Sequence, residues 1–274
     1  MTDSIDLDLY FSRIGYRGNP RADLETLSEL QRLHAEAIAF ENLDPLTGRR
    51  VKLDPASLQQ KLIVEGRGGY CFEHNGLMQL VLRKIGFDVI PLGARVMWNS
   101  PPDTILPRTH SLTCVRIGGE SYIVDVGFGS LTPTSPLRLQ TGIVQETNHE
   151  PMRLVAEGET YVLEALTEST WRPMYRFDLQ PQFPADYAMA NWYVSTFPES
   201  HFVNRLGVAR PVPGRRYTLR GAELAIHELA GQTTRTRLES VEELRRALTE
   251  IFGIRLPEEP SLDAALLRQL TVDS

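Results

Sequence analysis

The residue pattern changes from helical to strand-like near residue 87, and this change limits the fold class most strongly. Before it, one apolar stripe at helical spacing comprises Leu24, Leu27, Leu30 and Leu33. Asp54 followed by Pro55 is typical of a helix N-cap and first helical residue. After the change, residues 152–155 and 161–166 alternate like two strands around a Glu-Gly turn. A helical region followed by an antiparallel sheet or barrel is therefore expected.

A third region returns to mixed structure. Residues 186–194 have a helical pattern, and residues 217–220, 224–229 and 233–238 read as three further strands. The last predicted helix begins at Ser240, which forms a capping box with Glu243, and ends at Gly253. We predict an α+β protein with regions at residues 1–87, 88–195 and 196–274.

Composition excludes several classes of protein. The 274 residues are 42% hydrophobic, enough for a sizeable core. A net charge of −6 argues against nucleic acid or an anionic membrane as the main partner. The chain contains no apolar run of membrane-spanning length, and its start, MTDSIDLDLYF, lacks the basic-then-apolar order of a secretory signal. We expect a cytoplasmic protein whose two cysteines, Cys71 and Cys114, are free thiols.

Residues 67–75, RGGYCFEHN, place Cys71 at the start of a predicted helix. Unpaired backbone N–H groups and the positive end of the helix dipole favour a thiolate at this position. Gly68 and Gly69 are expected to let the backbone turn sharply and to leave the sulfur uncrowded. The competing interpretation is that Cys71 is a small buried residue, as most free cysteines are.

A predicted hairpin supplies a base and an acid. Residues 110–117 and 120–128 are strand-like and flank Gly118-Gly119, a pair that suits a two-residue primed turn. In that register His110 and Asp125 lie on one face as diagonal neighbours. A three-residue loop would instead send them to opposite faces. Asp125 needs a partner because its surroundings are apolar, and Arg67 is the alternative to His110.

These residues predict a triad of Cys71, His110 and Asp125, in which the acid orients the imidazole and the imidazole pairs with a thiolate. His74 is also placed to reach the sulfur but has no acid beside it, and Cys114 is expected to be a packed strand residue. The remaining histidines are expected to be surface or packing residues; they are His34, His149, His201 and His227. Cys71 and His74 lack a second ligand pair with zinc spacing, so no metal site is expected.

The chain resembles the arylamine N-acetyltransferase family in five segments. They are residues 40–43 (FENL), residues 67–75, Thr109-His110, residues 125–129 (DVGFG), and the segment from Ser195 to Phe202. The resemblance implies an N-terminal helical bundle, a central β-barrel and a C-terminal α/β lid with a papain-like core. It also implies a ping-pong reaction through a Cys71 thioester, with acetyl-coenzyme A as the acetyl-donor substrate, no bound cofactor, and an arylamine or arylhydrazine as acceptor.

The same resemblance implies residues that border the substrate cleft; they are Thr109, Gly127, Phe128, Gly129 and Phe202. It implies a supporting ion pair between Glu41 and Arg67. Ala39 departs from the proline usual before Phe-Glu-Asn, which puts the local turn in doubt. For coenzyme A phosphates no cradling motif is present, and surface solvation is expected for the arginines considered; they are Arg205, Arg210 and Arg215.

Other functions stay open at this point. A papain-like or transglutaminase-like thiol hydrolase uses the same order of triad residues, with water in place of the amine. An amide synthase of polyketide assembly resembles this family and accepts a large acyl chain. A scaffold that has kept the fold without activity is the third alternative. The acceptor amine, the acyl-chain preference and the oligomeric state are not predicted.

Overall fold

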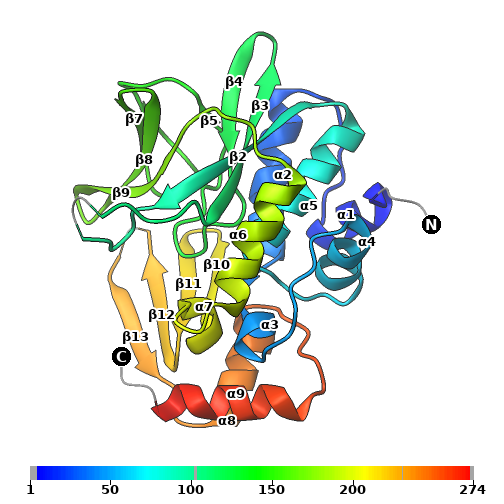
Figure 1. Ribbon diagram of the computed structural model, residues 1–274, viewed down its shortest axis with the longest axis vertical. Coiled ribbons are helices and arrows are strands. Elements are labelled where there is room, and N and C mark those ends of the chain that lie inside the picture. Colours follow the sequence, from blue (N-terminus) through cyan, green and yellow to red (C-terminus); the bar gives the residue numbers. More distant parts are fainter. Residues whose placement is uncertain (1–4, 102–103, 230, 272–274) are drawn as a thin grey trace.

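The computed structural model describes residues 5–101, 104–229 and 231–271, and its fold is α+β (Figure 1). The chain opens with helices. They are α1 (Leu7–Ile14), α2 (Leu24–Ala37), α3 (Leu43–Leu46), α4 (Pro55–Leu58) with a π-helical continuation (Gln59–Val64), and α5 (Cys71–Ile85). Asp54 caps α4 by accepting the N–H of Ser57, as predicted. In α2, Leu27 and Leu30 are buried, whereas Leu24 is 39% exposed, so it does not belong to the core stripe.

The second group of elements is an antiparallel sheet curled into a nearly closed barrel. Its strands are β2 (Asp88–Val96), β3 (His110–Ile117), β4 (Glu120–Val124), β5 (Leu137–Arg138), β6 (Val144–Gln145), β7 (Met152–Glu157), β8 (Thr160–Thr167) and β9 (Thr170–Phe177). Their order across the sheet is β5-β4-β3-β2-β9-β8-β7-β6. The predicted strand pair at residues 152–166 is β7 and β8, so that prediction is confirmed.

The third group combines helices with a second antiparallel sheet. Its elements are α6 (Pro184–Thr196), α7 (His201–Asn204), β10 (Gly207–Val212), β11 (Arg215–Arg220), β12 (Glu223–Glu228), β13 (Thr233–Arg237), α8 (Val241–Arg246) with a π-helical continuation (Ala247–Ile251), and α9 (Pro260–Thr271). In Figure 1, α6 runs down the centre of the view, from the level of the barrel to the level of this sheet, and α9 lies at the bottom. The boundaries drawn at residues 87/88 and 195/196 stay a prediction.

Helix α7, strand β10 and helix α9 of this group were not predicted. Strand β10 contains Pro211, which weakens a strand pattern, and it pairs with β1 (Phe40–Glu41) from the first region. The helix ending at Gly253 is not the last one, because α9 follows it and buries Leu262 and Leu266. Pro260 at its first position was a signal that would have found it.

Helix α5 packs on the β3–β4 hairpin, and this contact positions the site. One apolar cluster joins Leu77 and Val81 of α5 to Val115 and Val124 of the hairpin. A hydrogen bond from Asn75 to the Ser111 carbonyl places the start of α5 beside the start of β3. Within the described ranges, no helix combines the length and apolar character needed to cross a bilayer.

Candidate active site

The thiol of Cys71 lies at the first residue of α5, and its side chain is 3% exposed. Its Sγ is 3.6 Å from the carbonyl oxygen of Thr109, the residue before His110. The prediction for the glycine pair was wrong in its reason, because neither Gly68 nor Gly69 has a positive φ. They are needed for close packing: a Cβ on Gly68 would lie 2.0 Å from the Ala39 carbonyl oxygen, and one on Gly69 would lie 2.7 Å from the Glu73 carboxylate.

The hairpin has the predicted register. Ile117 pairs with Glu120 across Gly118 and Gly119, whose φ angles of 59° and 86° fit a primed two-residue turn. The ladder extends to the pair of Thr113 with Val124. Asp125 follows the end of β4, on the face that the register predicts.

His110 and Asp125 form a buried pair in which His110 Nε2 is 2.7 Å from Asp125 Oδ2. Burial opposes protonation of His110, but the charge and hydrogen bond of Asp125, aided by the Cys71 side chain, raise its pKa to about 10. Burial also opposes ionisation of Asp125, but His110 and further donors hold its pKa below the usual value. The geometry thus favours an imidazolium between a carboxylate and a sulfur. Arg67 is not the partner of Asp125.

Asn75, one turn after Cys71, connects the nucleophile helix to the acid. Its amide nitrogen donates to Asp125 Oδ1 at 3.0 Å and to the Ser111 carbonyl at 2.7 Å, and its Oδ1 accepts the N–H of Val126 at 3.1 Å. The Ser111 hydroxyl donates to the Cys71 carbonyl at 2.9 Å. Asn75 was quoted in the sequence motif without a role, and Ser111 was missed. Neither role is visible in the sequence because each bond joins residues far apart in the chain.

Gly127 lies where the acid loop packs closely against the start of α5. Its N–H donates to Asp125 Oδ1 at 2.9 Å, and a Cβ built on it would lie 2.8 Å from Cys71 Cα. Real Cβ atoms do not approach a backbone atom so closely, so any side chain here forces the acid loop away from α5.

We therefore expect Gly127→Ala to slow thioester formation at Cys71 by about 100-fold, the loss typical of an ångström-scale misplacement of reacting groups. The rate is measured by intact mass after mixing with acetyl-coenzyme A. Gly76→Ala is the matched control, because Gly76 lies within α5 and its nearest contact would be an ordinary 3.4 Å from a Leu58 methyl. A Gly127→Ala protein that reacts as fast as the control would contradict this account.

The other predicted cleft residues surround the same end of α5. The Phe128 ring stands edge-on to His110, with centroids 5.3 Å apart. Phe202 on α7 packs edge-on to Tyr70 at 5.3 Å. Gly129, with φ 97°, donates its N–H to Thr132, and Thr109 supplies the carbonyl beside the sulfur. That these residues contact substrate stays a prediction.

His74 does not serve the sulfur. Its Nδ1 is 2.9 Å from His34 Nε2, and its Nε2 is 3.2 Å from the Ala39 carbonyl oxygen. Burial lowers its pKa to about 4. Both ring nitrogens are therefore committed elsewhere, and His110 is the histidine paired with an acid.

Comparisons with known proteins agree with this geometry. A family profile described as N-acetyltransferase matches residues 23–260. The arylamine N-acetyltransferase of Mycobacterium tuberculosis is 44% identical over 282 residues, covering 99% of each chain, and that of Escherichia coli is 40% identical, covering 90% of this chain and 88% of its own. The chain belongs to the arylamine N-acetyltransferase family. The solved structure of the family member from Mycobacterium smegmatis superposes with a TM-score of 0.94 at 42% identity, covering 98% of this chain and 100% of its own.

A further family structure shows a ligand. The arylamine N-acetyltransferase of Mycobacterium marinum was solved in complex with CoA, and it superposes with a TM-score of 0.92 at 41% identity, covering 95% of this chain and 98% of its own. The papain-like core expected from the resemblance is consistent with the fold that these family structures share.

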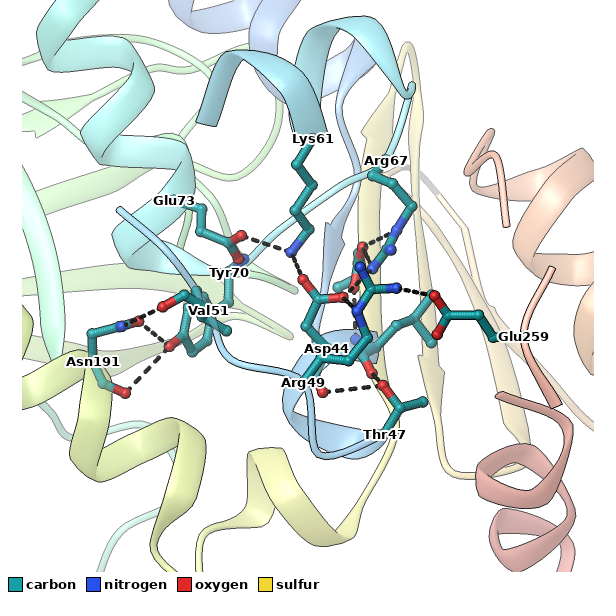
Figure 2. Close-up of polar contacts among 12 residues, drawn as sticks. Asp44, Thr47, Arg49, Val51, Lys61, Arg67, Tyr70, Glu73, Asn191 and Glu259 are labelled. Carbon is teal, nitrogen blue, oxygen red and sulfur yellow. Dashed lines mark hydrogen bonds and ion pairs between the residues drawn. The ribbon is translucent and has the colours of Figure 1, made fainter. Parts of the chain in front are cut away.

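Buried charges brace the loop before Cys71. Arg67 donates to Glu41 at 2.8 Å and to Asp44 at 3.0 Å, so the predicted ion pair of Glu41 with Arg67 is confirmed. Lys61 Nζ is 2.6 Å from a carboxylate oxygen of Asp44 and 2.6 Å from one of Glu73. Figure 2 shows Lys61 between these two side chains. Glu73 also accepts the N–H of Tyr70 at 3.1 Å. Burial raises the Glu73 pKa to about 7 against the opposing effect of Lys61.

Removing one member of this cluster should be costly. We expect Arg67→Met to lower the free energy of unfolding by about 3–5 kcal/mol, because it leaves the Glu41 carboxylate buried without its cation. Denaturant unfolding measures the loss. Arg138→Met removes an exposed ion pair with Glu120 and is expected to have little effect. Equal losses for the two variants would show that the buried pair is not a main support of the loop.

Residues outside the triad mostly have structural contacts. Both cysteines are free, as predicted, and burial raises the pKa of Cys114. The surface role expected for Arg210 was wrong, because its guanidinium donates to the carbonyls of Glu36 and Ile251. Arg215 faces Glu228 at 3.4 Å. Among the residues that the structure describes, no group of three or more His, Cys, Asp or Glu side chains is arranged to hold a metal ion.

Proposed function

We propose that this chain is an arylamine N-acetyltransferase that uses Cys71, His110 and Asp125 as its catalytic triad. The observation that carries the proposal is the buried pair of His110 with Asp125 beside a cysteine at a helix start, in a member of this family. The donor is acetyl-coenzyme A, and the acceptor is an aromatic amine or hydrazine. The bound CoA in the Mycobacterium marinum relative supports the choice of donor.

In the first half-reaction the Cys71 thiolate attacks the carbonyl carbon of the acetyl thioester. The bond from that carbon to the sulfur of coenzyme A breaks, and the His110 imidazolium gives its proton to the departing thiolate. In this proposal, backbone N–H groups at the start of α5 stabilise the oxyanion. The products are an acetylated Cys71, free coenzyme A and a neutral His110.

In the second half-reaction the amine nitrogen attacks the acetyl carbon on Cys71. His110 accepts the proton that the nitrogen loses, and the bond from carbon to Cys71 Sγ breaks. This step regenerates the pair of thiolate and imidazolium and releases the N-acetylated amine. The Asp125 carboxylate stabilises the imidazolium each time that it forms.

The comparisons favour this function over the alternatives. The relatives described above are named arylamine N-acetyltransferases, and none of those names describes a hydrolase or an amide synthase. We also propose that Thr109, Gly127, Phe128, Gly129 and Phe202 border the cleft for the amine and the pantetheine arm. The net charge of −6 supports small-molecule substrates over nucleic acid and is compatible with a cytoplasmic protein.

The proposal is tested by intact mass spectrometry after mixing the protein with acetyl-coenzyme A. We expect one acetyl group, mapped to the peptide that contains Cys71 and lost when an aromatic amine is added. Release of coenzyme A at a rate that does not respond to amine would support a hydrolase. Acylation only by long acyl donors would support an amide synthase, and no acylation by any donor would leave the scaffold interpretation.

A further inference from the structure

Three buried side chains form a hydrogen-bonded series next to the nucleophile helix α5. Tyr10 of α1 is 2.9 Å from Nδ1 of His34 on α2, and Nε2 of His34 is 2.9 Å from Nδ1 of His74 on α5. Nε2 of His74 is 3.2 Å from the carbonyl oxygen of Ala39. All three side chains are fully buried. This Tyr10–His34–His74 series therefore connects three helices within the core, outside the proposed triad.

The proton positions in the Tyr10–His34–His74 series follow from its last acceptor, the Ala39 carbonyl oxygen. A carbonyl oxygen only accepts, so His74 Nε2 carries a hydrogen, and Nδ1 of a neutral His74 is an acceptor. His34 must then donate from Nε2 and accept at Nδ1, where the Tyr10 hydroxyl is the donor. With both imidazoles neutral, every hydrogen bond in this series is satisfied and the Tyr10 hydroxyl hydrogen also has an acceptor.

The Cβ atom of His74 lies against Gly127, in the loop that follows Asp125. A Cβ on Gly127 would lie 3.0 Å from His74 Cβ and 2.8 Å from Cys71 Cα, so this loop rests directly on the first turn of α5. The Ala39 carbonyl that accepts from His74 also accepts the N–H of Gly69 at 3.4 Å. A shift of the His74 ring would thus be transmitted to the loop that holds Asp125 and to the segment before Cys71.

Helix α2 holds the site at a second point, one turn from His34. The amide nitrogen of Gln31 donates to the carbonyls of Pro133 and Ser135 at 3.0 and 3.1 Å, and the Asp125 carbonyl lies 3.4 Å away. The Gln31 Oε1 is buried with no partner among the described residues. An unpaired buried oxygen is unfavourable, so this orientation of the amide is maintained by the three carbonyls that converge on its nitrogen.

We propose that His34 and His74 are positioning residues for the thioester chemistry of Cys71, acting by locking the first turn of α5 onto α2. This inference rests on the proposed function. Neither imidazole contacts the sulfur or the dyad of His110 and Asp125. They act through the contact of α5 with Gly127, which sets the separation of the nucleophile from the acid loop.

The environment of the two rings supports their neutral forms. Burial, followed by the nearby His74 and Arg13, holds the pKa of His34 well below its usual value. For His74, burial outweighs the carbonyl of Ala39 and the charge of Glu41, which favour protonation, while the Lys61 charge acts with burial. Tyr10 is the remaining titratable group in contact with these two rings, and burial raises its pKa.

Protonation of His74 in acid destabilises the folded protein. The folded pKa of His74, about 4, lies below its ordinary value of 6.5, so its contribution to stability is intact above 6.5 and is lost as pH falls toward 4. Protonation of His74 places a hydrogen on its Nδ1, which then faces the hydrogen on His34 Nε2. The alternative is that every donor and acceptor in the series exchanges roles, which leaves the Tyr10 hydroxyl hydrogen without an acceptor. The hydrogen-bonded contact between His34 and His74 should therefore weaken in mild acid.

The test replaces His34 with leucine, an apolar side chain of similar volume, which removes the donor to His74. We expect His34→Leu to slow acetylation of Cys71 by about 10- to 100-fold, with an unchanged KM for the amine, because the reacting groups are misplaced and substrate contacts are not. His149→Leu is the matched control. His149 is another buried histidine that bonds a threonine hydroxyl and backbone carbonyls, but it has no bond to α5 or the triad.

Two further variants separate positioning from stability. His34→Gln keeps an amide donor and an amide acceptor, and it is expected to restore most of the acetylation rate. If His34→Leu does not fold, Tyr10→Phe removes only the outermost bond and is expected to slow acetylation relative to His149→Leu. Acetylation at the wild-type rate in the folded His34→Leu or Tyr10→Phe protein would overturn the inference, and so would equal slowing by His149→Leu.

The iodoacetamide reaction distinguishes this inference from the proposed function. Alkylation of Cys71, measured against Cys114 in the same protein, reports the local arrangement of the thiol without acetyl-coenzyme A. If wild-type protein is not acetylated, the proposed function fails. Slower alkylation of Cys71 in His34→Leu, but not in His149→Leu, would still support the positioning role, and equal rates in all three proteins would refute it.

Discussion

Cys71→Ser is expected to abolish acetyl transfer, with a loss of at least about 10³- to 10⁴-fold relative to the wild-type protein. A serine hydroxyl ionises far less readily than a thiol, so the paired imidazolium has no anionic nucleophile beside it. The helix start, the Thr109 carbonyl and the dyad would all remain in place. The measurement is the rate of coenzyme A release together with the mass of the protein after the reaction.

Cys114→Ser is the control for this variant. Cys114 lies within β3, is almost fully buried, and pairs with Ile90 and Ile123 in the sheet. Its replacement should leave acetyl transfer close to the wild-type rate, apart from a loss of stability. If instead Cys71→Ser kept its turnover, or the acetyl group mapped to Cys114, the assignment of the nucleophile would have to be abandoned.

Asp125→Asn is expected to lower the rate of Cys71 acetylation by about 10³- to 10⁴-fold. The amide removes the charge that raises the His110 pKa, so the burial of the imidazole is left to lower it. The imidazolium that stabilises the thiolate is then lost near neutral pH. A neutral side chain also leaves the donors from Asn75 and Gly127 without their anionic acceptor.

The same variant has a pH signature in stability. The folded pKa of His110, about 10, lies above the ordinary 6.5, so the pair contributes fully to stability below 6.5 and loses that contribution as pH rises through 10. The melting-temperature difference between wild type and Asp125→Asn should therefore shrink between about pH 6 and about pH 10. Asp88→Asn, at an exposed position facing Arg116, should show no such trend. A constant difference for Asp125→Asn would argue against the charged pair.

Local residue patterns were sufficient to predict two parts of the site, the helix that starts at Cys71 and the hairpin. The helix that starts at Cys71 is predicted by apolar residues at helical spacing that end at Gly86, which has φ 111° in the structure. The hairpin register is predicted because a two-residue turn leaves one pairing, which then brings His110 and Asp125 to one face. The order of the regions was also predicted from local pattern, family resemblance added the reaction, and the comparisons bear out the family and the fold.

Predictions that relied on local pattern alone failed elsewhere for physical reasons. Arg210 was expected at the surface because an isolated arginine usually is, yet the packing of β10 against α2 buries its contacts to Glu36 and Ile251. Gly68 and Gly69 were explained by turning, whereas the close approach of residues 39–41 and the Glu73 side chain exclude a Cβ there. Such constraints come from segments that meet only after folding.

Local residue patterns are enough to identify the residues that carry the chemistry, because helix starts and two-residue turns depend on neighbours along the chain. How the nucleophile lies against its base, and which side chains hold the two in place, depends on long-range packing. Asn75 reaches Asp125 across 50 residues, and His34 reaches His74 across 40. Contacts at such separations arise from the packing of whole apolar faces, here α5 against β3 and β4, and no periodicity within one segment encodes them.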